Sequence, residues 1–390
     1  MSRYDGTIGS FRNLFAEISK GTIERENERV LPRKQFRQLL DEGFGAMRVP
    51  EELGGLGYSG REFMATLIEL AEADSHIAHA FRGHFAFLEE RLSSSSDSVR
   101  ERWAERVVTD KHMIGSAWSE RHGGPNRLGR TSVVETPGGE LLLNGTKHFS
   151  TGTIFSDWID VSARFGDRER SVAVGRYTDG VEILDDWDGF GQALTGTGTT
   201  IFTNVAISPE NIGPFTDVTD TPWFQGAMFQ LTLLAVLVGI ARRAHTSQIH
   251  HVQTSTTPPF GSSLLLVRAQ DPLLVSEVGD ISGQVFAAEA AALIAAESLD
   301  AAFAERLSDP QHSTRALETN VATYRAQIAI VPAVTRITDQ IFESVGGSAT
   351  SRTHGLDRYW RNARIIASHN SIRHRAHNIG DYYVSGGLHN

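Results

Sequence analysis

Histidine has the widest choice of chemistry in this sequence, because imidazole can bind a metal, transfer a proton or donate a hydrogen bond near neutral pH. Three of the fifteen histidines lie close together near the C-terminus, at His369, His374 and His377. No pair of them has the i, i+4 spacing that places two imidazoles on one helical face, and no carboxylate cluster accompanies them. The chain has no cysteine, which excludes thiolate metal sites and cysteine nucleophiles. We therefore expect no metal site.

Two other patterns resemble functional motifs without meeting their requirements. Residues 55–60 (GLGYSG) have the G-x-G-x-x-G spacing of a dinucleotide-binding loop, but that loop follows a hydrophobic strand, and here Pro50 and two glutamates precede it. We interpret the segment as a structural turn. Ser150 and Ser156 lack the G-x-S-x-G context of a hydrolase nucleophile, so the sequence does not favour a hydrolase.

The composition is that of a globular protein with a large core: 390 residues, of which 40% are hydrophobic and 22% charged. A net charge of -10 with dispersed basic residues argues against a nucleic acid partner. The N-terminus lacks the features of a signal peptide, and the longest apolar run, 231–241, is too short to span a bilayer. We therefore expect a cytoplasmic protein with no membrane partner.

The predicted secondary structure that must position any site changes twice along the chain. Apolar residues have helical spacing from residue 10 to about residue 106, short alternating segments separated by turns follow, and the helical spacing returns from residue 223. In the last part we expect helices at 229–251, 272–306 and 317–345, and a shorter one near 360–383. The pattern predicts an α+β multidomain protein with an N-terminal helical domain (1–112), a central antiparallel β domain (113–214) and a C-terminal helical bundle (215–390).

Three pairs of segments carry a resemblance to a known family. They are VPEELGGLGYSG at 49–60 with ELAEAD at 69–74, GSAWSE at 115–120 with LNGTKHFSTG at 143–152, and FESVGG at 342–347 with DRYWRNAR at 357–364. Their order and spacing resemble those of acyl-CoA dehydrogenase-fold flavoproteins. The resemblance implies a four-helix bundle as the C-terminal domain, a flavin between the β domain and the bundle, and a homotetramer in which a neighbour completes the site.

The chemistry that the resemblance implies depends on residues 367–371 (ASHNS). Acyl-CoA dehydrogenases usually carry in this segment a glutamate that removes the α-proton of the substrate, and an asparagine such as Asn370 has no basic form near neutral pH. The segments NGTKHF at 144–149, DWDGFGQ at 186–192 and TGTGTT at 195–200 are closer to the monooxygenase branch of the fold, which includes the dibenzothiophene and dimethyl sulfone monooxygenases. The alternatives are an FAD-dependent acyl-CoA dehydrogenase or oxidase, and a flavin-fold protein without catalysis.

Membership of the monooxygenase branch implies a role for particular residues. His369 would contact the peroxide side of the flavin and donate a hydrogen bond to its C4a-hydroperoxide, Thr151 would place its hydroxyl near N5, and His84 would be a pocket histidine. Further cofactor contacts are expected from Trp118, Ser119, Phe149, Ser150, Trp187 and Asn370.

The cofactor and partners follow from the same resemblance. We expect reduced FMN, with FAD as the alternative, and dioxygen as a co-substrate. The arginines that tend to hold the flavin phosphate in the sulfur monooxygenases are replaced by hydroxyl residues near Thr257 and at Ser348, which leaves Arg268 or Arg352 as candidates. Since no credible nicotinamide-binding unit is present, we expect a separate NAD(P)H flavin reductase to supply the reduced flavin to an enzyme that oxygenates a small organic molecule.

Overall fold

Helices form the first part of the chain in the computed structural model, which describes residues 9–121, 130–215, 224–256, 267–309 and 314–386. The apolar residues that predicted these helices, such as Phe36 and Phe63, are buried. The helices are α2 (Arg12–Ser19), α3 (Thr22–Glu28), α4 (Arg33–Asp41), α5 (Gly60–Ala73), α6 (Ser75–Ala80), α7 (Arg82–Leu92) and α8 (Asp97–Val108).

The glycine-rich segment before α5 is a turn. A short 3-10 helix (Glu51–Leu53), and no strand, precedes it. Ser59 then caps α5 through a capping box with Glu62. A Cβ atom on Gly55 would lie 2.2 Å from the carbonyl oxygen of Val49, so glycine is required by close backbone packing. The segment therefore lacks the strand that a dinucleotide-binding loop needs.

The central part is an eight-stranded sheet with the order β6-β7-β3-β2-β4-β5-β8, and β1 pairs with β4. Within the described residues, β1 and β2 both pair with β4 in parallel, so the sheet is mixed and not purely antiparallel as expected. Between the parallel strands β2 and β4 the chain passes through β3 and residues 151–157, which gives the long connection that parallel pairing needs. The strands are β1 (Ile114–Ala117), β2 (Ser132–Glu135), β3 (Leu141–Ser150), β4 (Trp158–Phe165), β5 (Arg168–Gly175), β6 (Val181–Ile183), β7 (Gly198–Ile207) and β8 (Ile212–Phe215).

Three long helices form the core of the C-terminal part: α9 (Phe224–Thr254), α10 (Pro272–Ser308) and α11 (Thr314–Val345). By length and composition α9 could cross a membrane, but its apolar stretch is entirely buried inside the protein, as in a core helix of a soluble protein. The shorter helix expected near 360–383 is instead two helices, α12 (Asp357–Ala367) and α13 (Ile372–Ser385). The break between them contains His369 and Asn370.

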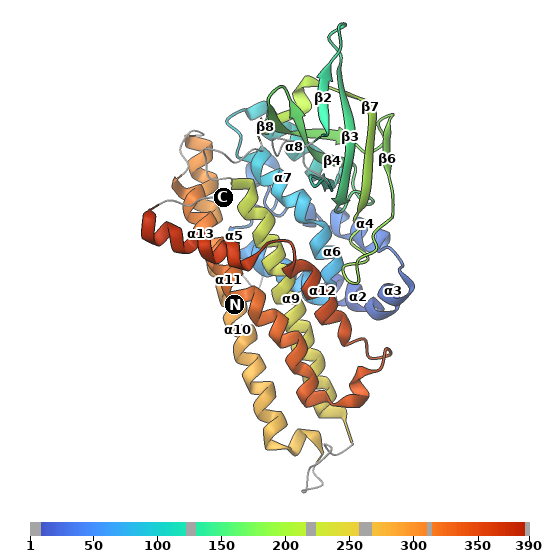
Figure 1. Ribbon diagram of the computed structural model, residues 1–390, viewed down its shortest axis with the longest axis vertical. Helices are drawn as coiled ribbons and strands as arrows, with labels where there is room; N and C mark the ends of the chain where they lie inside the picture. Colours follow the sequence, from blue (N-terminus) through green and yellow to red (C-terminus); the bar gives the residue numbers. More distant parts are fainter. Residues whose placement is uncertain (1–8, 122–129, 216–223, 257–266, 310–313, 387–390) are drawn as a thin grey trace.

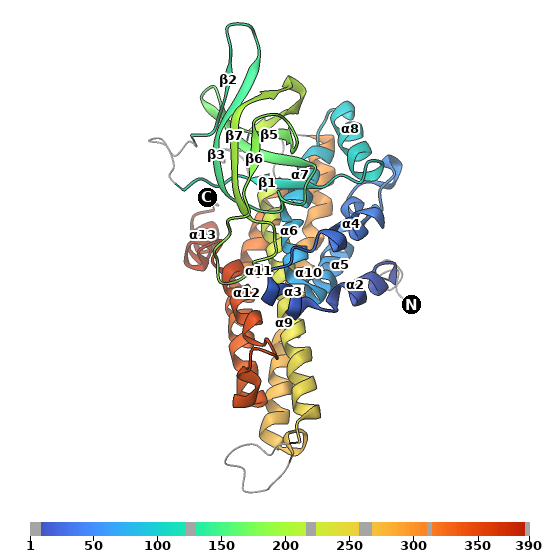
Figure 2. The same cartoon turned by 90° about the vertical axis from the view of Figure 1, so that its right-hand side faces the viewer.

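The sheet lies at one end of the molecule and the bundle extends away from it, with α6 and α7 beside the sheet end of α9 (Figure 1 and Figure 2). The break after α12 lies near this same junction (Figure 2). The fold is thus the α+β arrangement that the sequence predicted. We propose the domain boundaries 1–112, 113–214 and 215–390, because the element type changes between α8 and β1 and again between β8 and α9.

Candidate functional site

A cavity of about 430 Å³ lies where the sheet meets the helices. This volume is in the range of small-molecule sites, roughly 300–1,000 Å³. Five residues that the sequence predicted for the flavin site line it together: Ser119, Phe149, Thr151, Trp187 and His369. The remaining lining residues are His79, Arg82, Gln192, Thr197, Ile365 and Ser368.

An aromatic wall forms the sheet side of the cavity. Phe149 and Trp187 meet edge to face, with ring centroids 6.0 Å apart. Phe149 has a left-handed backbone (φ 59°), which a phenylalanine rarely adopts, at a bulge between β3 and β7. Its side chain is 54% exposed, and the indole Nε1 of Trp187 is fixed by donating to the carbonyl oxygen of Gly191 at 3.0 Å. The strained backbone therefore holds a large apolar ring open to the cavity.

Hydroxyl groups lie beside this wall. Thr197 donates a hydrogen bond to the hydroxyl of Thr151 at 3.1 Å, and Thr151 donates to the carbonyl oxygen of Phe149 at 3.3 Å. The second bond is long for an O–H donor, so the Thr151 hydroxyl proton is weakly held. A better acceptor on a bound molecule could replace that carbonyl.

His369 reaches the cavity from the break after α12. Its Nδ1 lies 3.1 Å from the carbonyl oxygen of Ile365. A carbonyl oxygen only accepts, so Nδ1 carries the proton and Nε2 has a free lone pair in the neutral ring. The surrounding protein atoms, and then the charge of Arg82, lower the pKa of His369 to about 4. At neutral pH Nε2 is therefore an acceptor, whereas the resemblance had implied a ring that donates.

His79 on α6 is a second cavity histidine, which no motif in the sequence indicated. Its Nδ1 lies 3.1 Å from Oε1 of Gln192, whose amide nitrogen donates to Ser75 at 3.3 Å. The Nε2 atom is buried without a partner in the described part of the chain, and the ring lies 5.2 Å from that of His369. Burial, followed by the charges of His369 and Arg82, lowers the pKa of His79 well below its usual value. The cavity thus contains two neutral imidazoles, both with Nδ1 protonated.

The structure places His84 outside the lining of this cavity. Its Nε2 donates to the carbonyl oxygen of Gly45 at 2.9 Å, and its Nδ1 accepts from the backbone of Ile114 at 3.2 Å. The side chain is fully buried, and burial lowers its pKa to about 4. Both ring nitrogens are occupied by the backbone, which fits a structural role. The nearby histidine that lines the cavity is His79, which lies on α6 five residues before His84 in the chain.

Three predicted cofactor contacts, Trp118, Ser150 and Asn370, are not among the lining residues. Trp118 donates to the carboxylate of Asp160 at 2.9 Å and packs on Phe229. Ser150 is fully buried, and Asn370 donates to Gln230 at 2.6 Å. Asn370 therefore helps to fix the break between α12 and α13, next to His369. The predicted contacts of all three with the cofactor stay predictions.

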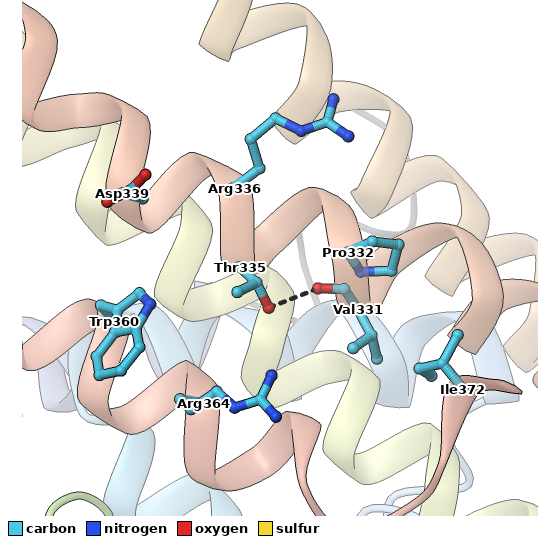
Figure 3. Close-up of a pocket in the computed structure, with 8 residues that line it drawn as sticks. All are labelled: Val331, Pro332, Thr335, Arg336, Asp339, Trp360, Arg364 and Ile372. Atoms are coloured by element: carbon cyan, nitrogen blue, oxygen red, sulfur yellow. Dashed lines mark hydrogen bonds between the residues drawn. The ribbon is translucent and has the colours of Figure 1, made fainter.

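A second cavity, of about 590 Å³, lies on α11, α12 and the start of α13 (Figure 3). None of the predicted site residues lines it. Its polar groups are dispersed: the guanidinium groups of Arg336 and Arg364 extend from different helices, and Thr335 donates to the carbonyl oxygen of Val331 in its own helix (Figure 3). The convergence of polar groups that marks a catalytic site is found in the first cavity instead.

Comparison with known proteins shows the family of the chain. Residues 10–111 match the N-terminal domain of acyl-CoA dehydrogenase, and residues 231–374 match its C-terminal domain. A dibenzothiophene monooxygenase of Mycolicibacterium goodii is 27% identical, covering 98% of this chain and 95% of the relative. A probable FMNH2-dependent monooxygenase, SfnC of Pseudomonas putida, is 27% identical, covering 96% of this chain and 93% of the relative. The crystal structure of TdsC from Paenibacillus sp. A11-2 with FMN and indole is 25% identical, covers 99% of this chain and 98% of that one, and has a TM-score of 0.89.

The chain therefore belongs to the acyl-CoA dehydrogenase family of flavoproteins. Within that fold, its similarity over nearly the whole chain places it among the flavin-dependent monooxygenases. The cavity fits a flavin: Phe149 offers an exposed ring on which a flat heterocycle can stack, and the unpartnered Nε2 of His79 offers an acceptor for a ring N–H.

Proposed function

We propose that the protein is the oxygenase component of a two-component system, which takes reduced FMN from a separate NAD(P)H flavin reductase. It would oxygenate a small organic molecule at a sulfur or nitrogen centre. The observation that carries this proposal is the convergence of Ser119, Phe149, Thr151, Trp187 and His369 on one cavity. When bound, the reduced flavin supplies two electrons to dioxygen, so that one oxygen atom enters the substrate and the other leaves as water.

The protein's own residues would position the reactants and control protons. Phe149 would stack on the flavin ring from the sheet side, Trp187 would meet that ring with its edge, and the Thr151 hydroxyl would lie near N5 of the flavin. His79 and His369 would accept hydrogen bonds at Nε2 from the helical side, since both rings are neutral at pH 7. A site that excludes water favours oxygen transfer over release of hydrogen peroxide.

An acyl-CoA dehydrogenase activity is less consistent with this lining. Removal of an α-proton needs a base of suitable pKa within hydrogen-bond reach. Among the described lining residues there is no aspartate or glutamate, and the two histidines have lowered pKa values. We therefore expect that acyl-CoA thioesters will not bleach bound flavin under anaerobic conditions. Bleaching by a common acyl-CoA would favour the dehydrogenase instead.

We further propose a cytoplasmic homotetramer. The helix α10 exposes large apolar side chains at Leu273, Phe286 and Ile294, which is typical of a helix that packs on another subunit. The candidate phosphate ligand Arg268 precedes α10, and Arg352 follows α11. The start of α10 and the end of α11 lie at the end of the bundle remote from the sheet (Figure 1). The exposed Arg352 would therefore serve the cavity of a neighbour, whereas Arg268 is buried and donates to the carbonyl oxygen of Ser344 at 2.9 Å. Thr257 lies outside the described residues.

Isotope labelling tests the proposed reaction directly. Photochemically reduced FMN, the protein, 18O2 and a panel of small sulfides, sulfoxides and amines would be mixed, and products analysed by mass spectrometry. We expect products that contain one 18O atom. If every compound is recovered unchanged while the flavin is oxidised, the proposed activity is wrong.

A further inference from the structure

Arg82, the first residue of α7, lines the cavity with a guanidinium group that the fold leaves largely unused. Its Nε donates to the carbonyl oxygen of Phe229 at 3.2 Å, and the group lies over the Phe229 ring, 4.6 Å from the centroid. These contacts fix the orientation of the guanidinium plane. The terminal nitrogens Nη1 and Nη2 make no hydrogen bond or ion pair with any residue that the structure describes.

Two other arginines with little exposed side chain are neutralised by ion pairs. Arg48 pairs with Glu89 and Asp300, and Arg358 pairs with Glu26. Among the described residues, no carboxylate performs this function for Arg82. The first turn of α7 also has no acidic residue, so Arg82 brings an uncompensated positive charge to the cavity lining.

Burial lowers the pKa of Arg82 to about 10, so the side chain remains charged at neutral pH. A partly buried cation without a partner destabilises a folded protein, because it loses hydration without gaining an ion pair. The cost is removed when a ligand brings a negative charge to the cavity. The free pair of nitrogens has the geometry that binds two oxygens of one oxyacid group.

We propose that Arg82 determines substrate specificity by pairing with an anionic group of the substrate, such as a sulfinate, sulfonate or carboxylate. This inference rests on the proposed function. The aromatic wall comes from the sheet side, whereas Arg82, His79 and His369 come from helical segments. A flavin ring stacked on Phe149 thus leaves the guanidinium group of Arg82, on the helical side, to the second ligand.

The test compares two compounds of similar size that differ in charge: benzenesulfinate and methyl phenyl sulfoxide. Binding to protein loaded with oxidised FMN would be followed by tryptophan fluorescence and by thermal shift, without turnover. We expect the wild type to bind benzenesulfinate about ten- to a hundredfold more tightly than the sulfoxide, the range for a charge-assisted hydrogen-bonded pair. Arg82→Met, which keeps the length of the side chain, should abolish this preference.

Two further variants make the comparison specific. Arg82→Lys keeps the charge but loses the paired nitrogens, so it should retain only part of the preference and serves if Arg82→Met folds poorly. Arg37→Met removes an exposed arginine that pairs with Asp41 on α4, and should retain the full preference. The affinity of each variant for FMN would be measured by quenching of flavin fluorescence, and we expect less than a threefold change.

The outcomes separate this inference from the proposed function. A wild-type protein without preference for the anion, or a preference that survives in Arg82→Met, would overturn the inference. So would weaker FMN binding by Arg82→Met with an unchanged ratio between the two compounds, because Arg82 would then serve the flavin. Binding of benzenesulfinate that depends on Arg82, combined with no 18O incorporation into any compound, would support the role of Arg82 and overturn the proposed reaction.

Discussion

Replacing His369 by alanine is the sharpest test of the proposed site. The substitution removes the ring that reaches the cavity from the break after α12, and leaves Phe149 and Trp187 in place. It also removes one neutral hydrogen bond, from Nδ1 to the carbonyl oxygen of Ile365. Such a bond contributes about 1 kcal/mol to the free energy of unfolding, so we expect His369→Ala to fold normally.

The effect on catalysis should be much larger than the effect on stability. Loss of a group that takes part in proton transfer typically lowers a rate by about a hundredfold or more. FMN affinity should change less than about threefold, since the aromatic wall supplies the stacking surface. The variant should therefore oxidise reduced FMN and release hydrogen peroxide in place of oxygenated product.

The assay is a single turnover of reduced FMN in oxygenated buffer, with product and hydrogen peroxide measured per flavin oxidised. His374→Ala, an exposed histidine on α13 outside the cavity lining, is the matched control and should behave as the wild type. Because the pKa of His369 is about 4, its contribution to the yield should be constant from pH 6 to pH 8 and decline toward pH 4. Equal yields in wild type and His369→Ala would refute the assignment.

Three other predictions concern stability, cofactor binding and reduction. The fully buried His84 has a pKa of about 4 in the folded protein, against 6.5 in the unfolded chain, so between these pH values only the unfolded chain gains the proton. The free energy of unfolding should therefore fall by about 3 kcal/mol from pH 6.5 to pH 4. In urea denaturation, His84→Gln should show a smaller dependence of this free energy on pH. Phe149→Asn should fold at least as stably as the wild type, because asparagine tolerates a left-handed backbone. It should bind FMN roughly three- to tenfold more weakly in flavin fluorescence titrations, because the stacking ring is lost. Purified protein with oxidised FMN should not consume NADH or NADPH in an absorbance assay unless a reductase is added; rapid consumption without one would point to a nicotinamide site.

The sequence predicted the parts of the fold that follow from local patterning. The helical spacing around Phe36 and Phe63 indicated the N-terminal helices, and the alternating segments indicated the sheet. The parallel pairing of β1 and β2 with β4 could not be predicted in this way, because pairing joins residues distant in the chain. The break at 368–371 was missed because neither glycine nor proline marks it; Ser371 caps α13 there.

The candidate site was predicted in part for the same reason. Motifs located Phe149, Thr151 and His369, since the resemblance extends to their immediate neighbours. The resemblance did not distinguish His79 from His84, which lie five residues apart in consecutive helices. Only packing decides which of the two rings faces the cavity. Arg82 was not singled out either, as an arginine is notable only once its lack of a carboxylate partner is known.

The cavity has a consequence for how activity is gained and lost. The lining comes from α6, α7, the end of β3, the segments around Trp187 and Thr197, and the end of α12. The site therefore joins segments that are nearly 300 residues apart in the chain, from His79 to His369. No single domain contains it. Local unfolding of the break between α12 and α13, or loosening of the contact between sheet and bundle, would abolish activity while most helices remained intact. Catalytic activity is therefore a more sensitive reporter of native assembly in this protein than its helical content.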